Sequence, residues 1–144
     1  MDKLKRELTV DAELSHLDDV VGFVENLLGT TSCPMKLTMQ VVLCVEELFV
    51  NVASYAYGDQ KGICIINLET QHTDKQGGVS IEIIDFGKPF NPLEKEDPDI
   101  TLSADQRQIG GLGIYMVKQS MDRVTYEYKD GKNILRLEKS WGIL

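Results

Sequence analysis

The chain has 144 residues, of which 42% are hydrophobic and 26% charged, as is ordinary for a globular protein of one domain. Its 15 basic and 23 acidic residues give a formal net charge of −8. A chain this acidic is repelled by phosphate backbones and anionic lipid, which argues against general binding to nucleic acid or to membrane surfaces.

The cysteines and the N-terminal sequence indicate the compartment. Cys33, Cys44 and Cys64 form no C-x-x-C pair, and two of them lie in apolar runs, so we expect buried free thiols in a reducing cytosol. The two histidines lie too far apart in the sequence to supply a zinc cluster. The N-terminus has no apolar signal core, and no uninterrupted apolar run approaches 18 residues. We therefore expect a cytoplasmic protein with a single domain over residues 1–144.

The first half of the chain predicts a strand and two helices. Residues 4–10 roughly alternate between apolar and polar and predict a strand. Apolar residues at helical spacing predict a helix over residues 14–28, which Gly29 ends. A second helix is expected to begin at Ser32-Cys33-Pro34, because proline is tolerated in a first helical turn, and to run to Tyr57.

The middle of the chain predicts a hairpin and then a long connection. Residues 63–69 and 79–86 predict two strands, joined by a loose polar tip over 71–78. The stretch that follows holds three of the four prolines, an acidic cluster and a run of glycines. A structureless stretch of this length in a compact domain is usually functional or disordered. We therefore expect a flexible lid over approximately residues 87–113.

The end of the chain completes the expected fold. A short apolar helix is predicted over residues 114–121, followed by a hairpin of strands 124–128 and 134–138 around an Asp-Gly turn. Tyr126 and Tyr128 alternate with polar residues, and we expect both to face the core. Strands paired by hairpins with helices between them indicate an α+β fold. The predicted architecture is a two-layer sandwich with helices on one face of a mixed, mostly antiparallel sheet.

The long central helix carries an unexpected polar stripe. Between residues 39 and 50 only one glutamine and two glutamates are polar, so this helix is predicted to be mostly buried. Glu47, Asn51 and Tyr55 follow one another at a spacing of four and therefore share one face. Buried polar side chains need a partner or a polar cavity. The stripe indicates either a polar cavity or a glutamate at the edge of the helix, with Asn51 hydrogen-bonded to a loop.

Asp85 ends a strand face that is otherwise apolar, after Val79, Ile81 and Ile83. A carboxylate at the end of a core-facing row needs a hydrogen-bond donor, and a purine amino group is a candidate. The alternative is an ordinary Asp-x-Gly turn at the end of a strand.

A run of glycines, Gly110-Gly111-Leu112-Gly113, opens the last helix. Glycines let backbone amides turn toward an anion at the positive end of a helix, as in many phosphate sites. A flexible hinge is the alternative. The chain has neither the Walker-A lysine spacing nor a strand followed by G-x-G-x-x-G, which excludes P-loop and Rossmann nucleotide sites.

Together and in this order, these segments resemble the motifs of the GHKL ATPase superfamily, which includes gyrase, histidine kinases and MutL. Residues 47–57 resemble its N-box, residues 85–92 (Asp-Phe-Gly-Lys-Pro-Phe-Asn-Pro) its G1 box and residues 110–117 its G2 box. The Pro-Phe-Asn-Pro ending and the later Met121-Asp122 are similar to those of the bacterial anti-sigma-factor serine kinases, or switch-protein kinases. The resemblance covers essentially the whole chain and implies a GHKL-type sandwich with an ATP lid.

The resemblance assigns chemistry to the first two boxes. Glu47 would be the general base that orients or deprotonates the attacking hydroxyl. Asn51, one turn later, would coordinate Mg²⁺, a spacing that suits phosphoryl transfer. Asp85 would accept a hydrogen bond from the adenine amino group, and Gly87 would let the backbone approach the ring.

In the third box, the resemblance implies that Gly111 and Gly113 line the triphosphate and that Gly110 is a hinge of the lid. It also indicates that Arg107, on the lid, reaches the phosphates. We therefore expect ATP and Mg²⁺ as the ligands of this protein.

Some positions depart from the family pattern. Tyr55 stands where the N-box often has a histidine. The family commonly has a threonine near adenine, beside the glycine of the final hairpin, whereas this chain has Lys132-Asn133 there. Asn133 is the candidate to replace it by hydrogen bonding. Lys88 and Lys95 are alternatives to the lid arginine for the phosphate contact.

The function implied by the resemblance is that of an ATP-dependent protein serine kinase that acts as an anti-sigma factor. It would bind a sigma factor and phosphorylate a serine of an anti-anti-sigma (STAS-type) antagonist in a partner-switching pathway. The family acts as a homodimer, and we expect no direct contact with nucleic acid or membrane. The alternative is a nucleotide-gated anti-sigma or adaptor module with little or no kinase turnover. A structural protein that has lost its nucleotide is a third hypothesis.

Overall fold

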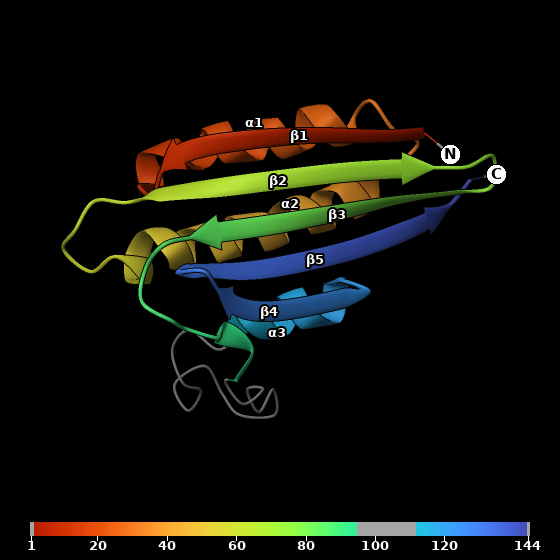
Figure 1. Ribbon diagram of the computed structural model, residues 1–144. Coiled ribbons are helices and arrows are strands. Elements are labelled where there is room, and N and C mark those ends of the chain that lie inside the picture. Colours follow the sequence, from red (N-terminus) through yellow and green to blue (C-terminus); the bar gives the residue numbers. More distant parts are fainter. Residues whose placement is uncertain (1, 95–111, 144) are drawn as a thin grey trace.

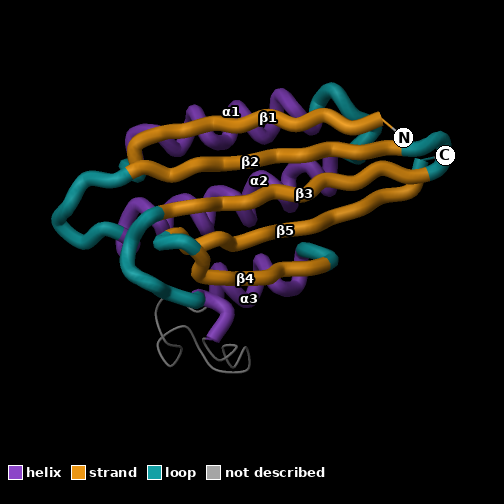
Figure 2. The backbone as a smooth tube through the Cα atoms, in the orientation of Figure 1, coloured by secondary structure: helices purple, strands orange, loops and turns teal. Residues whose placement is uncertain are grey.

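The fold is a two-layer sandwich, as the hairpin pattern predicts. The computed structural model describes residues 2–94 and 112–143. Three α-helices cover one face of a five-stranded sheet (Figures 1 and 2). Every pair of neighbouring strands in these residues is antiparallel, so the expectation of a mixed sheet is corrected to an antiparallel one. The reason is that the connections between neighbouring strands are hairpins or bring the chain back in the opposite direction, whereas parallel neighbours need a crossover connection.

The sheet has the order β1-β2-β3-β5-β4. Its strands are β1 (Asp2–Asp11), β2 (Ile63–His72), β3 (Gln76–Asp85), β4 (Arg123–Lys129) and β5 (Lys132–Gly142). The β4–β5 hairpin turns at Asp130 and Gly131, with φ angles of 54° and 78°, as the Asp-Gly pair predicts. Both ends of the described chain lie at the same end of the sheet (Figure 1), where Ile143 donates a backbone hydrogen bond to Lys75.

The tip of the β2–β3 hairpin is shorter than predicted. His72 pairs with Gly77, so the strands continue through most of the segment that its glycines and polar residues suggested was a loop. Gly77 lies opposite Trp141 of β5, and a Cβ at Gly77 would approach the indole ring to 2.5 Å. Trp141 is 5% exposed and its Nε1 donates to Ser32 Oγ at 3.0 Å. The glycine is therefore a strand residue that makes room for the ring.

The helices are α1 (Leu17–Leu28), α2 (Met35–Asn51) and α3 (Leu112–Ser120), with short helical turns η1 (Leu14–His16), η2 (Val52–Ala56) and η3 (Pro92–Glu94). Pro34 is the N-cap of α2 with a φ of −59°, close to the angle that its ring imposes. After Asn51 the helix widens into the π-helical turn η2, which no sequence pattern predicted. Gly58 then ends the helical segment with a φ of 58°.

One core lies between the helices and the sheet. α2 is the central helix and packs against α1 on one side and α3 on the other (Figure 1). The largest fully buried side chains come from the three α-helices and from β2, β3 and β5: Val20, Val24, Leu28, Val41, Cys44, Val45, Phe49, Ile66, Leu68, Ile81, Val117 and Leu137. The 22-residue segment Met35–Ala56 is long and apolar enough to pass a length-and-composition test for a membrane span. Its position as the central helix of this core accounts for its apolar character.

All three cysteines are free, and Cys44 and Cys64 are buried, as predicted. Burial raises the pKa of the Cys44 thiol to about 11. Burial, with a further contribution from the Asp85 carboxylate, raises the pKa of the Cys64 thiol to about 12. Both groups are therefore neutral thiols at physiological pH and contribute to packing rather than to nucleophilic chemistry.

Replacing Phe49 by alanine is expected to lower the free energy of unfolding by about 3–5 kcal/mol, because the change leaves a cavity in a close-packed core. The phenylalanine is 0% exposed. Leu43→Ala on the same helix is the matched control, since Leu43 is 49% exposed, and we expect it to cost less than about 1 kcal/mol. Denaturant unfolding followed by circular dichroism measures both. Equal costs would contradict the assignment of Phe49 to the core.

Candidate functional site

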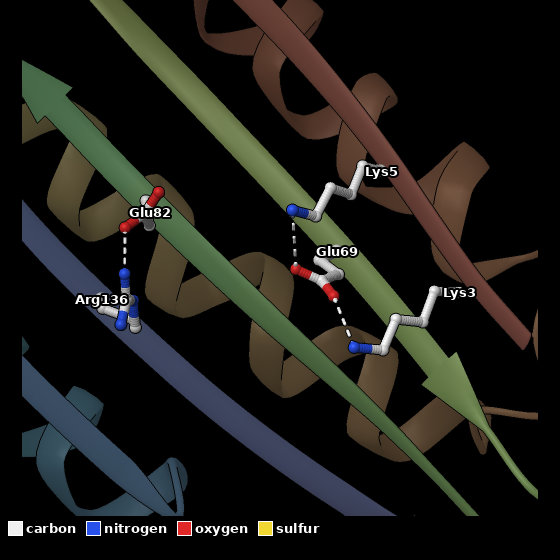
Figure 3. Close-up of polar contacts among 5 residues, drawn as sticks. All are labelled: Lys3, Lys5, Glu69, Glu82 and Arg136. Atoms are coloured by element: carbon white, nitrogen blue, oxygen red, sulfur yellow. Dashed lines mark hydrogen bonds and ion pairs between the residues drawn. The ribbon is translucent and has the colours of Figure 1, made fainter. Parts of the chain in front are cut away.

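A hollow of about 900 Å³ lies on the open face of the sheet. Charged side chains line it and pair with one another across the strands (Figure 3). Glu69 lies 3.8 Å from Lys3 and 3.7 Å from Lys5, and Glu82 pairs with Arg136. Such solvent-exposed pairs contribute little to stability. None of the predicted catalytic, nucleotide-binding or metal-binding residues lines this hollow, so it is a solvated sheet surface rather than the candidate site.

A smaller cavity of about 270 Å³ lies where α2 ends beside the end of β3 and the start of β5. It is mostly apolar with a few polar groups, which is the usual character of a small-molecule pocket. Its lining consists of Leu48, Asn51, Val52, Tyr55, Ala56, Ile83, Asp85, Lys88, Phe90, Pro92, Tyr126, Asn133 and Leu135. The fold therefore brings the predicted Asn51 and Asp85 together on one cavity, although they lie on a helix and a strand far apart in the chain.

Asp85 is the last residue of β3 and is only 6% exposed. Its Oδ1 accepts a hydrogen bond of 2.9 Å from the backbone N–H of Gly87 and another of 2.9 Å from the side-chain amide of Asn133. The first of these bonds is the Asp-x-Gly turn that the sequence offered as the alternative. No described residue donates to Oδ2, so this oxygen is left for a ligand in the cavity that Asp85 lines.

Asn133 lies directly opposite Asp85 in the ladder between β3 and β5 and is 6% exposed. Its Nδ2 donates to the Lys88 carbonyl at 2.9 Å as well as to Asp85. Its Oδ1 accepts from the Phe90 backbone N–H at 3.1 Å and from the Tyr126 hydroxyl. One buried amide thus joins the end of β3, the segment after it and the final hairpin. Figure 1 shows this segment running past the ends of β5 and β4 to η3.

Tyr57 ties the end of the helical segment to the same region. Its hydroxyl accepts a hydrogen bond of 2.8 Å from the Phe86 backbone N–H and donates to the Ile63 carbonyl. Burial raises the pKa of Tyr57, so the hydroxyl keeps its proton at neutral pH. A Cβ on Gly87 would lie 2.1 Å from the carbonyl oxygen of Ala56. Glycine is therefore required at 87 by the close approach of two backbone segments.

Glu47 and Asn51 lie one turn apart near the end of α2, and both are partly buried. Gly113, at the start of α3, packs directly against Glu47, because a Cβ on Gly113 would lie 2.1 Å from Glu47 Oε1. The N-terminal end of a helix favours a negative charge. Glu47 thus lies where α2 meets the beginning of α3 and is not among the residues that line the cavity, whereas Asn51, one turn later on α2, lines it.

Three predicted site residues, Arg107, Gly110 and Gly111, lie outside the described residues, as does most of the predicted lid. Lys88, which we considered as an alternative to the arginine, lines the cavity. Tyr55 also lines it, at the position where the N-box often has a histidine, and its side chain is 64% exposed.

Sequence reasoning missed part of the site. Tyr126 was expected to face the core, and it is partly buried against it, but it also lines the cavity and bonds to Asn133. Tyr128 was also expected to face the core, and this prediction is wrong because its side chain is 46% exposed near the end of the hairpin. The contacts among Tyr126, Asn133 and Asp85 follow from the register that places Asp85 opposite Asn133. Because these two residues are 48 positions apart, no local sequence pattern indicates that register.

A turn between β1 and α1 gathers Asp11, Glu13 and His16, whose ligand atoms can come within 4.8 Å of one another. The group is largely exposed, and it does not include Asn51, the predicted Mg²⁺ ligand. His16 Nδ1 already lies 3.0 Å from Asp19, and that hydrogen bond raises the pKa of His16. This favours the protonated ring, which is a poor metal ligand, so the turn is a charged surface feature.

The chain matches the model of the histidine kinase-like ATPase domain over residues 10–139. The chain belongs to this family of ATPases. It is 28% identical over 131 residues to the serine/threonine-protein kinase BtrW of Bordetella bronchiseptica, a match that covers 91% of this chain and 89% of that protein.

Solved structures share the fold of this ATPase domain. A crystal structure of the RsbU and RsbW domains of Rv1364c from Mycobacterium tuberculosis superposes with a TM-score of 0.63 at 16% identity. It matches 96% of this chain, which spans 33% of that longer chain. The SiaB–SiaC complex from Pseudomonas aeruginosa gives a TM-score of 0.50 at 15% identity and covers 93% of this chain and 89% of the other.

The cavity fits the ATP that membership of the family implies. Apolar side chains such as Ile83 and Leu135 line it and suit the faces of a purine ring. Asp85 offers an acceptor oxygen among them, which suits an exocyclic amino group. The residues that line the cavity therefore fit a nucleotide base.

Replacing Gly113 by alanine tests the contact with Glu47. Alanine in place of glycine within a helix normally stabilises by roughly 0.5–1 kcal/mol. At position 113 we expect the opposite sign, a loss of roughly 1–3 kcal/mol, because the new methyl group would overlap the Glu47 carboxylate. Gly22→Ala in α1 is the control, since nothing lies within 4 Å of its Cβ position. Stabilisation by both changes in denaturant unfolding would place Glu47 away from α3.

Proposed function

We propose that the protein is an ATP-dependent protein serine kinase that acts as an anti-sigma factor in a partner-switching pathway. The observation that carries the proposal is the convergence of Glu47, Asn51 and Asp85 at one end of α2, around and beside a single cavity. Similarity to a serine/threonine-protein kinase over 91% of the chain supports the same reaction class.

The proposed nucleotide site uses the two predicted residues that line the cavity. Asp85 accepts a hydrogen bond from the adenine amino group through the oxygen that no described residue occupies. Asn51 offers an oxygen ligand of the type that Mg²⁺ prefers. When bound, Mg²⁺ supplies positive charge to the phosphates, which a chain of net charge −8 otherwise repels. Lys88 on the cavity wall adds a cation near the same place.

The proposed general base is Glu47. The acceptor serine attacks the γ-phosphorus through its Oγ, and its proton passes to Glu47. The bond between the γ-phosphorus and the oxygen that bridges it to the β-phosphate breaks, and ADP leaves with that oxygen. Phosphoryl transfer of this kind depends mainly on positioning and on charge neutralisation. Contact with Gly113 restricts where the Glu47 carboxylate can lie, so the base is held next to the Asn51 side of the cavity.

The proposed switch follows from charge. A sigma factor and an unphosphorylated antagonist of the STAS type compete for the protein. Phosphate on the antagonist's serine adds about −1.5 to −2 charges, and the net charge of −8 on the kinase then opposes rebinding. We further propose a cytoplasmic homodimer of single domains, residues 1–144, with a lid over approximately residues 87–113.

A second candidate function is a nucleotide-gated anti-sigma or adaptor module with little or no kinase turnover. The observation that favours it is Tyr55, which stands on the cavity wall at the position where the N-box often has a histidine. Incubation with candidate antagonist domains and labelled ATP separates the two functions. Transfer of label to a serine supports the kinase, whereas a tight complex without transfer supports the module.

Nucleotide binding is tested first by thermal unfolding with Mg-ATP, Mg-ADP and Mg-GTP. A ligand at 100 times its Kd adds about 2.7 kcal/mol, which is a shift of roughly 5 °C or more for a domain of this size. We expect this shift with the adenine nucleotides and a smaller one with GTP. No shift at millimolar nucleotide would contradict both candidate functions and leave the third hypothesis, a protein that has lost its nucleotide.

Catalysis is tested by Glu47→Gln, with Glu46→Gln as the matched control. The two glutamates are adjacent, but successive helical residues point about 100° apart, so only Glu47 shares the stripe with Asn51. We expect Glu47→Gln to lower phosphoryl transfer by about 10²–10⁴-fold, the usual contribution of a general base, while ADP still binds. Glu46→Gln is expected to retain transfer. Undiminished transfer by the Glu47 variant would remove it from the mechanism.

A further inference from the structure

Among the described residues, the buried amide of Asn133 donates the one side-chain hydrogen bond that Asp85 accepts. We propose that Asn133 is a positioning residue that makes the cavity selective for a purine with a 6-amino group, and that it acts through Asp85 without touching the base. This inference rests on the proposed function, because it assumes that a nucleotide base enters this cavity.

The hydrogen bonds fix the orientation of the amide. The Lys88 carbonyl can only accept and lies 2.9 Å from Nδ2, while the Phe90 backbone N–H can only donate and lies 3.1 Å from Oδ1. These two backbone groups determine which end of the amide is oxygen and which is nitrogen. With Asp85 and Tyr126 as its other partners, all four hydrogen-bonding positions of Asn133 are used within the protein. It has no group left with which to contact a base.

The fixed amide in turn fixes the Asp85 carboxylate. Oδ1 receives two hydrogen bonds, from Gly87 and from Asn133, each at 2.9 Å. These two donors hold the plane of the carboxylate and leave Oδ2 for the cavity. A carboxylate oxygen accepts hydrogen bonds and repels other acceptors. It therefore favours the amino group at position 6 of adenine over the carbonyl of a 6-oxo purine.

Asn133 also holds two walls of the cavity. Lys88 and Phe90 both line it, and both are bonded to this amide through their backbones. The Tyr126 hydroxyl lies 3.2 Å from the same Phe90 N–H and closes the network. The Asn133 side chain thus positions both the Asp85 carboxylate and the neighbouring cavity wall at Lys88 and Phe90. In this way it controls which base binds without touching the base.

The test compares the binding of ADP with that of inosine diphosphate, which has a carbonyl at position 6. Isothermal titration calorimetry gives both affinities for the wild type, Asn133→Leu and Asn133→Thr. Leucine has a similar size and no hydrogen-bonding group, whereas threonine keeps one donor for Asp85. Asn67→Leu is the matched control, because Asn67 lies on β2 and lines the hollow on the open face of the sheet. Denaturant unfolding without nucleotide checks that each variant is folded.

We expect the wild type and Asn67→Leu to prefer ADP. Asn133→Leu is expected to weaken ADP binding by about 10–100-fold, as for loss of a hydrogen bond that orients a charged group. Binding of inosine diphosphate is expected to change much less, so the ratio of the two affinities falls. Asn133→Thr is expected to recover part of that ratio, which a purely structural contribution would not predict.

Three results would overturn the inference. Equal losses for both nucleotides would make Asn133 a general support of the pocket, and unchanged affinities for both would show that Asp85 keeps its orientation without the amide. If Asn133→Leu does not fold, Asn133→Thr decides alone. An unchanged ratio of the ADP and inosine diphosphate affinities in this variant would contradict the inference, and a reduced ratio would support it. A wild type that binds neither nucleotide overturns the proposed function as well. If the wild type prefers ADP but the Asn133 variants do not change this preference, only the inference about Asn133 is wrong.

Discussion

The cross-strand hydrogen bond between Asn133 and Asp85 is the contact on which the site depends. It joins residues 48 positions apart and exists only while β3 and β5 keep one register, since a slip of one residue would place the two side chains on opposite faces of the sheet. That register is itself set by the apolar face of the sheet, where Ile81 and Leu137 lie opposite each other in the core. The pocket chemistry is therefore a consequence of how the core packs. A carboxylate and an amide can be buried here because each is the other's partner.

The central helix serves the core and the site with different parts of its length. Toward the sheet α2 buries valines, Cys44, Leu48 and Phe49, whereas near its end it presents Glu47 and Asn51. The π-helical turn that follows shifts the backbone, so that Ala56 meets Gly87 and Tyr57 reaches Phe86. π-helical turns recur at functional sites, where they re-aim side chains at some cost in hydrogen-bond geometry. This one connects the helix that supplies Asn51 to the strand end that supplies Asp85.

The sequence predicts the elements well because they depend on local signals. Hydrophobic spacing located α1, α2 and most strands, Gly29 and Gly58 mark real helix ends, and the Asp130-Gly131 turn is where expected. The polar stripe and the strand-end aspartate, combined with the family resemblance, also predicted that Asn51 and Asp85 share one site. Both residues line the same cavity. The length of the β2–β3 tip was wrong because Gly77 is needed under Trp141, a contact across strands. The network around Asn133 could not be predicted for the same reason, since no local pattern displays the pairing of β3 with β5.

Cys64 gives the protein a built-in probe of this pairing. It is 0% exposed and lies directly opposite Asp85 in the β2–β3 ladder, so a thiol reagent can reach it only when that part of the sheet opens. Its rate of modification therefore measures the frequency of opening next to the site, on the timescale at which local unfolding occurs. The half-buried Cys33 lies just before α2, away from that ladder, and reacts as an internal standard within the same molecule. Without any substitution, the chain can thus report how firmly the strands beside the cavity are held together.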